Sequence, residues 1–278
     1  MRLSSTDGVE LQVHDLGGDG TPLLLCHATG FHGQVWRPLA PLLRGAHHVW
    51  SLDFRGHGTS SAPDPARGYA WEGFGDDVAA VVDGLGLERP VAVGHSKGGA
   101  ALLLAEAARP GTFAALWCYE PIVLPPGSTP GGGGDSALAS GAARRRPTFP
   151  SRLAAVEHYA AKPPLQALHP DALAAYVEHG FGDQADGTVA LRCKPEDEAA
   201  VYRMGGTHHA WDGLPSVGCP TWVACGGSGG TITPAMATEL AGRLPAGRVR
   251  VFEELGHFGP LEDPVAIAAA LRTDLVGA

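Results

Sequence analysis

The stretch from residue 91 to residue 108 constrains the fold of this chain more than any other. A β-branched run at 91–93 ends abruptly in the motif Gly-His-Ser-Lys-Gly at 94–98, and an apolar segment follows. This order predicts a strand, a sharp turn and a helix. Glycines on both sides of Ser96 let the strand and the helix approach closely and leave the serine hydroxyl exposed at the apex. The pattern therefore predicts a nucleophile elbow.

The same Gly-x-Ser-x-Gly spacing occurs a second time, at residues 226–230 around Ser228. A short motif is only as informative as its context. After residue 230 too few elements remain to build a site, and Pro234 delays the next helix. We therefore interpret Ser228 as a loop residue and Ser96 as the candidate nucleophile.

Strand and helix patterns alternate on both sides of the elbow. Two strands are expected before residue 21. Further strands are expected at 22–26, 48–54, 91–95, 113–119, 219–225 and 249–252, and helices at 35–43, 71–85, 99–108, 234–244 and 260–275. This alternation predicts an α/β fold with a doubly wound, mostly parallel sheet of eight strands, with the site at the carboxyl ends of the strands.

The alternation breaks after the strand at 113–119. Residues 125–150 are rich in Gly and Pro, and two short helical patterns follow at 151–161 and 169–180. Long connections of this kind are commonly lids or binding loops. We therefore expect a core in two parts, 1–124 and 213–278, with a helical cap at 125–212 inserted after the sixth strand.

Composition excludes several classes of function. The net charge is −9, and the one dense basic run, at 144–146, is interpreted as a solvated loop, so no nucleic-acid partner is expected. The five cysteines and 13 histidines lack metal-ligand spacing, so neither a metal nor a disulfide is expected. No apolar leader or membrane span is visible. We expect a cytoplasmic monomer or homodimer without a membrane partner.

Four signatures, in this order along the chain, resemble those of the α/β-hydrolase family. They are HATG at 27–30 after the third strand, DFRGHGTS at 53–60 after the fourth, GHSKG at 94–98 after the fifth, and GHF at 256–258 after the last. The resemblance is strong for residues 20–120 and 215–275 and weak for the expected cap. It implies the α/β-hydrolase fold and a catalytic triad.

The resemblance also implies roles for individual residues. A serine hydroxyl is a weak nucleophile near neutral pH, so Ser96 needs a base, and His257 is the candidate. The backbone amides of Thr29 and Lys97 are expected to form the oxyanion hole. The Lys97 side chain is either incidental or lies at the rim of the pocket.

The acid of the triad departs from the usual pattern. In most members of the family it follows the seventh strand, but the corresponding loop here, 226–230, holds no carboxylate. Some relatives, such as certain haloalkane dehalogenases, place the acid after the sixth strand, where this chain has Glu120. The alternative interpretation of Glu120 is a charge at the mouth of the cap. Glu253 and Glu254 rank below it because they precede His257 on the last strand and turn.

The nucleophile restricts the chemistry. Haloalkane dehalogenases and epoxide hydrolases of this fold use an aspartate at the elbow, whereas Ser96 implies an acyl-enzyme. We expect a carboxylic-ester hydrolase without a cofactor, acting on a small-molecule ester, lactone or thioester. Two alternatives stay open: a ligand-binding or receptor-like protein with little turnover, and a carbon-carbon bond hydrolase that uses the same triad.

Overall fold

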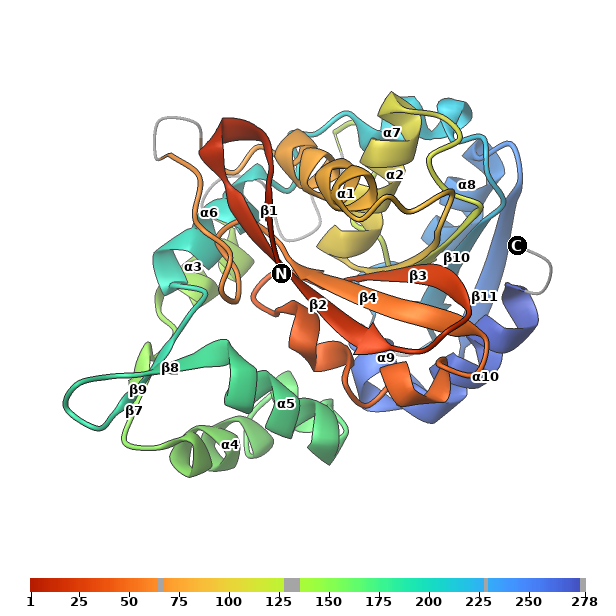
Figure 1. The fold of residues 1–278 in the computed structure, drawn as a ribbon. Helices are drawn as coiled ribbons and strands as arrows, with labels where there is room; N and C mark the ends of the chain where they lie inside the picture. The colour runs from red at the N-terminus through yellow and green to blue at the C-terminus, as the bar shows by residue number, and fades with distance from the viewer. Residues whose placement is uncertain (65–67, 128–135, 228–229, 276–278) are drawn as a thin grey trace.

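A mixed sheet of eight strands forms the centre of the protein (Figure 1). The computed structural model describes residues 1–64, 68–127, 136–227 and 230–275. The strands are β1 (Arg2–Ser4), β2 (Glu10–Gly17), β3 (Thr21–Cys26), β4 (His47–Asp53), β5 (Val91–His95), β6 (Ala115–Tyr119), β10 (Thr221–Gly226) and β11 (Gly247–Phe252). Their order is β1-β2-β4-β3-β5-β6-β10-β11. Strand β2 is antiparallel to both of its neighbours, and the six strands that follow it in this order are parallel to one another. The predicted eight-stranded, mostly parallel sheet is confirmed.

Helices cover both faces of the sheet, which explains why its central strands are apolar on both sides. One face packs against α1 (Glu72–Gly84), α2 (Lys97–Ala108) and α8 (Pro234–Arg243), and the other against α10 (Pro264–Asp274) and two short 3-10 helices, η2 (Gly33–Trp36) and η3 (Ala40–Leu42). In Figure 1 the first group lies above the sheet and α10 lies below it. A further 3-10 helix, η1 (Thr6–Gly8), joins β1 to β2.

Two expected helices differ from the structure, and prolines explain both differences. The helix expected at 35–43 is replaced by η2 and η3, because Pro38 and Pro41 lack the N–H that an α-helix interior needs. The helix expected at 260–275 is divided into α9 (Gly259–Glu262) and α10. Asp263 between them has an extended φ of −136° and caps α10, whose first residue is Pro264.

The segment between β6 and β10 is not wholly helical as expected. It contains a three-stranded antiparallel sheet in the order β7-β9-β8, whose strands have only two or three residues each, too few for a period-two pattern to be visible in the sequence. Its elements are α3 (Ala137–Ala143), β7 (Thr148–Phe149), α4 (Arg152–Ala160), η4 (Leu165–Ala167), α5 (Pro170–Gly180), β8 (Phe181–Asp183), β9 (Val189–Leu191), α6 (Pro195–Met204), α7 (Ala210–Gly213) and η5 (Leu214–Ser216). We call residues 136–204 the insertion.

The register of the parallel strands places the ends of neighbouring strands side by side. His95, the last residue of β5, pairs with Tyr119, the last residue of β6, and Tyr119 pairs with Ala224 of β10. Residues 96 and 120 therefore leave the same edge of the sheet next to each other. Backbone pairing alone thus brings Ser96 and Glu120, 24 positions apart in sequence, next to each other.

Candidate active site

Ser96 occupies a strained turn between β5 and α2. Its φ of 54° and ψ of −115° lie outside the conformations that a serine ordinarily adopts. The turn is held by the hydrogen bond from Ser96 N to Tyr119 O, 2.9 Å long. A Cβ on Gly98 would lie 2.2 Å from the carbonyl oxygen of Cys26, so only glycine allows this close approach. Ser96 itself is 7% exposed.

Glu120 leaves the end of β6 with a positive φ of 43° and a fully buried side chain. Its carboxylate accepts hydrogen bonds from the backbone N–H groups of Gly226 at 3.1 Å, Thr231 at 2.7 Å and Ile232 at 3.1 Å. It also accepts a hydrogen bond from Nδ1 of His257 at 2.6 Å. The backbone of Glu120 therefore follows β6 directly, but its carboxylate lies against the loop that follows β10.

These contacts keep the Glu120 carboxylate ionised. Burial alone would raise its pKa, but the hydrogen bond and charge of His257, together with the amides of Gly226 and Ile232, hold the pKa below its ordinary value. A buried carboxylate with this set of donors can orient an imidazole and stabilise its protonated form.

Glycine in the loop after β10 makes room for this carboxylate. A Cβ on Gly230 would lie 2.2 Å from Oε1 of Glu120, so a larger residue would displace the acid. Ser228, which we interpreted as a loop residue, lies outside the described residues. The side chains of Glu253 and Glu254 are exposed, and neither bonds to the ring of His257.

His257 lies on the loop after β11, and this loop is anchored from the core. The ring of His95 contacts the carbonyl oxygen of His257 at 2.8 Å, and the hydroxyl of Tyr119 donates to the carbonyl oxygen of Gly256 at 2.7 Å. With Nδ1 engaged by Glu120, Nε2 is the nitrogen available to a nearby hydroxyl. The Ser96 hydroxyl makes no hydrogen bond to any residue that the structure describes. In enzymes without bound substrate such bonds are often long and shorten only in the substrate complex.

The two expected oxyanion donors follow β3 and the elbow. Neither the backbone N–H of Thr29 nor that of Lys97 donates to another residue in the described part of the chain. The Lys97 side chain does not reach the pocket rim. It is fully buried, with Nζ 4.0 Å from the ring centre of Phe54 and 4.1 Å from that of Phe74, and burial lowers its pKa to about 7.

The other polar residues of the signatures hold their own and neighbouring loops in place. His27 accepts a hydrogen bond from Phe54 N at 3.1 Å, and Nδ1 of His57 contacts the carbonyl oxygen of Arg55 at 2.8 Å. Burial lowers the pKa of both histidines. Asp53 accepts hydrogen bonds from the backbone of Gly33 at 2.7 Å and Thr59 at 2.8 Å. These contacts anchor the loops that carry the signatures.

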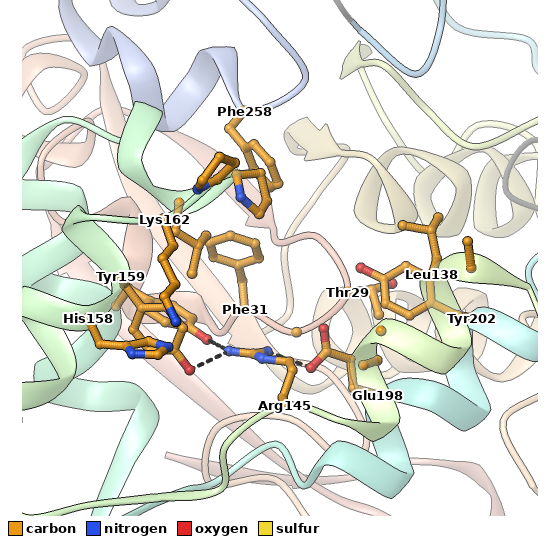
Figure 2. A pocket seen from close by; sticks show the side chains of 18 residues that line it. Thr29, Phe31, Leu138, Arg145, His158, Tyr159, Lys162, Glu198, Tyr202 and Phe258 are labelled. Carbon is orange, nitrogen blue, oxygen red and sulfur yellow. Dashed lines mark hydrogen bonds and ion pairs between the residues drawn. The ribbon is translucent and has the colours of Figure 1, made fainter.

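A cavity of about 380 Å³ lies between these loops and the insertion (Figure 2). Residues 29–31 and Phe258 line it from the core side. From the insertion it is lined by apolar side chains and by a polar group centred on Arg145, which contacts Glu198, Tyr159 and Tyr176.

The structure corrects our interpretation of the basic run 144–146. Arg144 and Arg146 are exposed, as a solvated loop requires, but the Arg145 side chain is only 18% exposed and faces the cavity. The sequence held no sign of this, because nothing near Arg145 indicates that partners 14, 31 and 53 positions away surround it.

The described residues form neither a metal site nor a membrane-spanning helix. No three His, Cys, Asp or Glu side chains among them gather as potential metal ligands. None of the helices seen in that part of the chain is long and apolar enough to cross a membrane. All five cysteines are buried and free.

Comparison with known proteins places the chain among hydrolases. A model of the alpha/beta hydrolase family matches residues 23–270. Lipase LipV of Mycobacterium tuberculosis is 28% identical over 277 residues, which cover 96% of this chain and 98% of the lipase. Epoxide hydrolase A of the same organism is 37% identical over 99 residues, 35% of this chain and 31% of the relative. The chain thus spans about a third of the length of that relative.

Solved structures agree with the fold. The crystal structure of E-2-(acetamidomethylene)succinate hydrolase matches with a TM-score of 0.84 and 20% identity, covering 100% of this chain and 98% of that one. The esterase RhEst1 of Rhodococcus sp. matches with a TM-score of 0.77 and 22% identity, covering 100% and 98%. The family model covers most of the sequence, and the observed sheet has the architecture that the four signatures implied. The chain belongs to the alpha/beta hydrolase family.

Proposed function

We propose that this protein is a serine hydrolase that cleaves a small-molecule carboxylic ester, lactone or thioester through an acyl-enzyme on Ser96. Its catalytic residues are Ser96, His257 and Glu120. The observation that carries this proposal is the 2.6 Å contact between Nδ1 of His257 and the buried carboxylate of Glu120, on loops adjacent to the Ser96 elbow.

The mechanism follows from these contacts. The Ser96 hydroxyl attacks the ester carbonyl while Nε2 of His257 takes its proton, and Glu120 stabilises the imidazolium that forms. The N–H groups of Thr29 and Lys97 donate to the oxyanion of the tetrahedral intermediate, a contribution typically worth ~100-fold to 1,000-fold in rate. His257 then protonates the leaving alcohol, and a water molecule activated by the same histidine releases the acid and restores Ser96.

Two features of the structure support the proposal. The N–H groups expected at the oxyanion hole are free of other described partners. The cavity beside them, at about 380 Å³, is at the small end of the range for small-molecule sites, which favours a compact substrate over a long acyl chain.

The test combines turnover with covalent labelling. We expect the protein to hydrolyse 4-nitrophenyl esters of short acids and to form one organophosphonate adduct, mapped to Ser96 by peptide mass spectrometry. Ser96→Ala should abolish both signals. Labelling of Ser96 without turnover of any ester or lactone would favour the carbon-carbon hydrolase, and absence of both would favour a ligand-binding protein. Either result would overturn the ester-hydrolase proposal.

A further inference from the structure

The polar groups that the insertion presents to the cavity near Arg145 are mostly hydrogen-bond donors. Nη1 of Arg145 donates to Glu198, and Nη2 donates to the hydroxyl oxygens of Tyr159, at 3.0 Å, and Tyr176 (Figure 2). Each tyrosine oxygen thus acts as an acceptor toward the guanidinium. Neither hydroxyl donates to any residue in the described ranges, so both O–H groups remain available to a ligand.

Further donors on this side of the cavity are also free. Nε of Arg145 and the second hydrogen of Nη1 have no partner among the described residues. Lys162 lines the same cavity, and its ammonium forms no ion pair within the part of the chain that the structure describes. Among the described lining residues, Glu198 is the one carboxylate, whereas Arg145 and Lys162 supply two cationic side chains. This side of the cavity therefore carries a net positive charge and an excess of donors over acceptors.

The charged group lies beside the loop expected to hold the oxyanion. A Cβ placed on Gly30 would lie 2.5 Å from Oε1 of Glu198 and 3.4 Å from Nη1 of Arg145. Gly30 follows Thr29 directly, so the guanidinium is adjacent to the proposed oxyanion loop. A ligand that reaches from Thr29 to Arg145 is therefore short.

Most of the other lining residues are apolar. Phe31 and Phe258 contribute from the core, and Leu138 and Leu165 from the insertion. The cavity thus matches a molecule with a few hydrocarbon carbons and one acidic end. A planar carboxylate fits the fork of an arginine, and hydrogen bonds between ionised partners are about twice as strong as those between neutral ones.

We propose that the substrate carries a free carboxylate, which binds Arg145 and the hydroxyls of Tyr159 and Tyr176 while the ester carbonyl lies at Ser96. This inference rests on the proposed function. It names the substrate class as small esters with a second, acidic end, and makes Arg145 the residue that selects them. Lys162 adds to the attraction for the anion.

The test compares anionic esters with neutral esters of matched length. The anionic probes are 4-nitrophenyl hydrogen glutarate, with the carboxylate on the acyl part, and 4-acetoxybutyrate, with it on the alcohol part. Their neutral partners are 4-nitrophenyl pentanoate and methyl 4-acetoxybutyrate. We expect one anionic probe to exceed its partner in kcat/KM by about 10-fold to 100-fold, mainly through a lower KM, since hydrogen bonds to charged groups have this strength.

Variants test whether Arg145 and the two tyrosine hydroxyls cause the preference for anionic esters. Arg145→Met should reduce the ratio of anionic to neutral kcat/KM by about 10-fold to 100-fold. Because this change leaves Glu198 unpaired and can impair folding, the double variant Tyr159→Phe/Tyr176→Phe, which keeps shape and charge, serves as the second test and should reduce the ratio by about 10-fold. Arg144→Met, in the exposed neighbour, is the matched control and should leave the ratio unchanged.

A binding measurement separates this inference from the proposed function. By calorimetry, Ser96→Ala should bind glutarate, and adding Arg145→Met should weaken that binding at least 10-fold. If neutral esters are hydrolysed as well as anionic ones, or if the preference persists without Arg145 and without the two hydroxyls, the inference is wrong although the hydrolase stands. If Ser96 takes no phosphonate but glutarate still binds through Arg145, the proposed function fails and the carboxylate site stands.

Discussion

The residues proposed for the reaction and the insertion side of the cavity are positioned in different ways. On the core side, Ser96 and Glu120 follow paired residues of adjacent parallel strands, so the register of the sheet places them. On the insertion side, Arg145 meets partners 14, 31 and 53 positions away through the packing of α3 to α6. The comparison teaches that strand pairing fixes the residues proposed for the reaction, whereas packing of the insertion fixes those proposed for selection. Variants of the core residues should therefore lower the rate for all esters, whereas variants of the insertion residues should lower the preference for anionic esters.

The largest effect is expected from Glu120→Gln. The amide removes the charge that orients and stabilises the His257 imidazole, and the equivalent change in another triad lowers kcat about 10⁴-fold. Because the loss lies in the chemistry, kcat should fall by the same factor for anionic and neutral esters, as measured by initial rates at saturation. A loss confined to anionic esters would mean that Glu120 acts in substrate selection, and the distinction between core residues for the reaction and insertion residues for selection would be wrong.

A smaller loss is expected from Gly230→Ala. The new methyl group would lie 2.2 Å from Oε1 of Glu120 and push the carboxylate away from His257. A displacement of about 1 Å in a catalytic arrangement can reduce the rate ~100-fold. The matched control is Gly242→Ala, where an added Cβ meets nothing within 4 Å. Equal kcat values in the two variants would show that Gly230 does not determine the position of the Glu120 carboxylate.

The smallest effect is expected from Lys97→Met, and it concerns stability. Burial lowers the pKa of Lys97 from 10.5 to about 7, so between these values the unfolded chain binds more protons and wild-type stability rises with pH. The variant lacks this dependence. It should unfold at a higher urea concentration than the wild type. Its free energy of unfolding near pH 7 should be larger by about 1–3 kcal/mol, the usual cost of an unsatisfied buried group such as Nζ of Lys97. The difference should shrink toward pH 10; a constant difference would contradict a titrating Lys97.

The sequence was sufficient to predict the fold of the core and its candidate residues, but it was not sufficient to predict the structure of the insertion. The difference lies in whether a residue's position follows from a local sequence pattern. Motifs at the ends of strands have a place as soon as the sheet is inferred, so Ser96, His257 and Glu120 could be named as candidates, and the structure places Glu120 against His257. Short elements such as β8 and β9 show no period, and the environment of Arg145 depends on contacts that no local pattern encodes. Pro38 and Pro41, which replace the helix expected at 35–43 with two short 3-10 helices, were visible in the sequence.

The measurement that tests the central claim most directly is the rate at which an organophosphonate labels Ser96, followed by intact-protein mass spectrometry. This rate reports activation of the serine without the contributions of ester binding and product release. We compare the wild type with Glu120→Gln and with Glu253→Gln, which removes a nearby exposed carboxylate. The account predicts that Glu120→Gln slows labelling by orders of magnitude and that Glu253→Gln labels at the wild-type rate. Labelling of Glu120→Gln at the wild-type rate, or equal slowing in both variants, would contradict it.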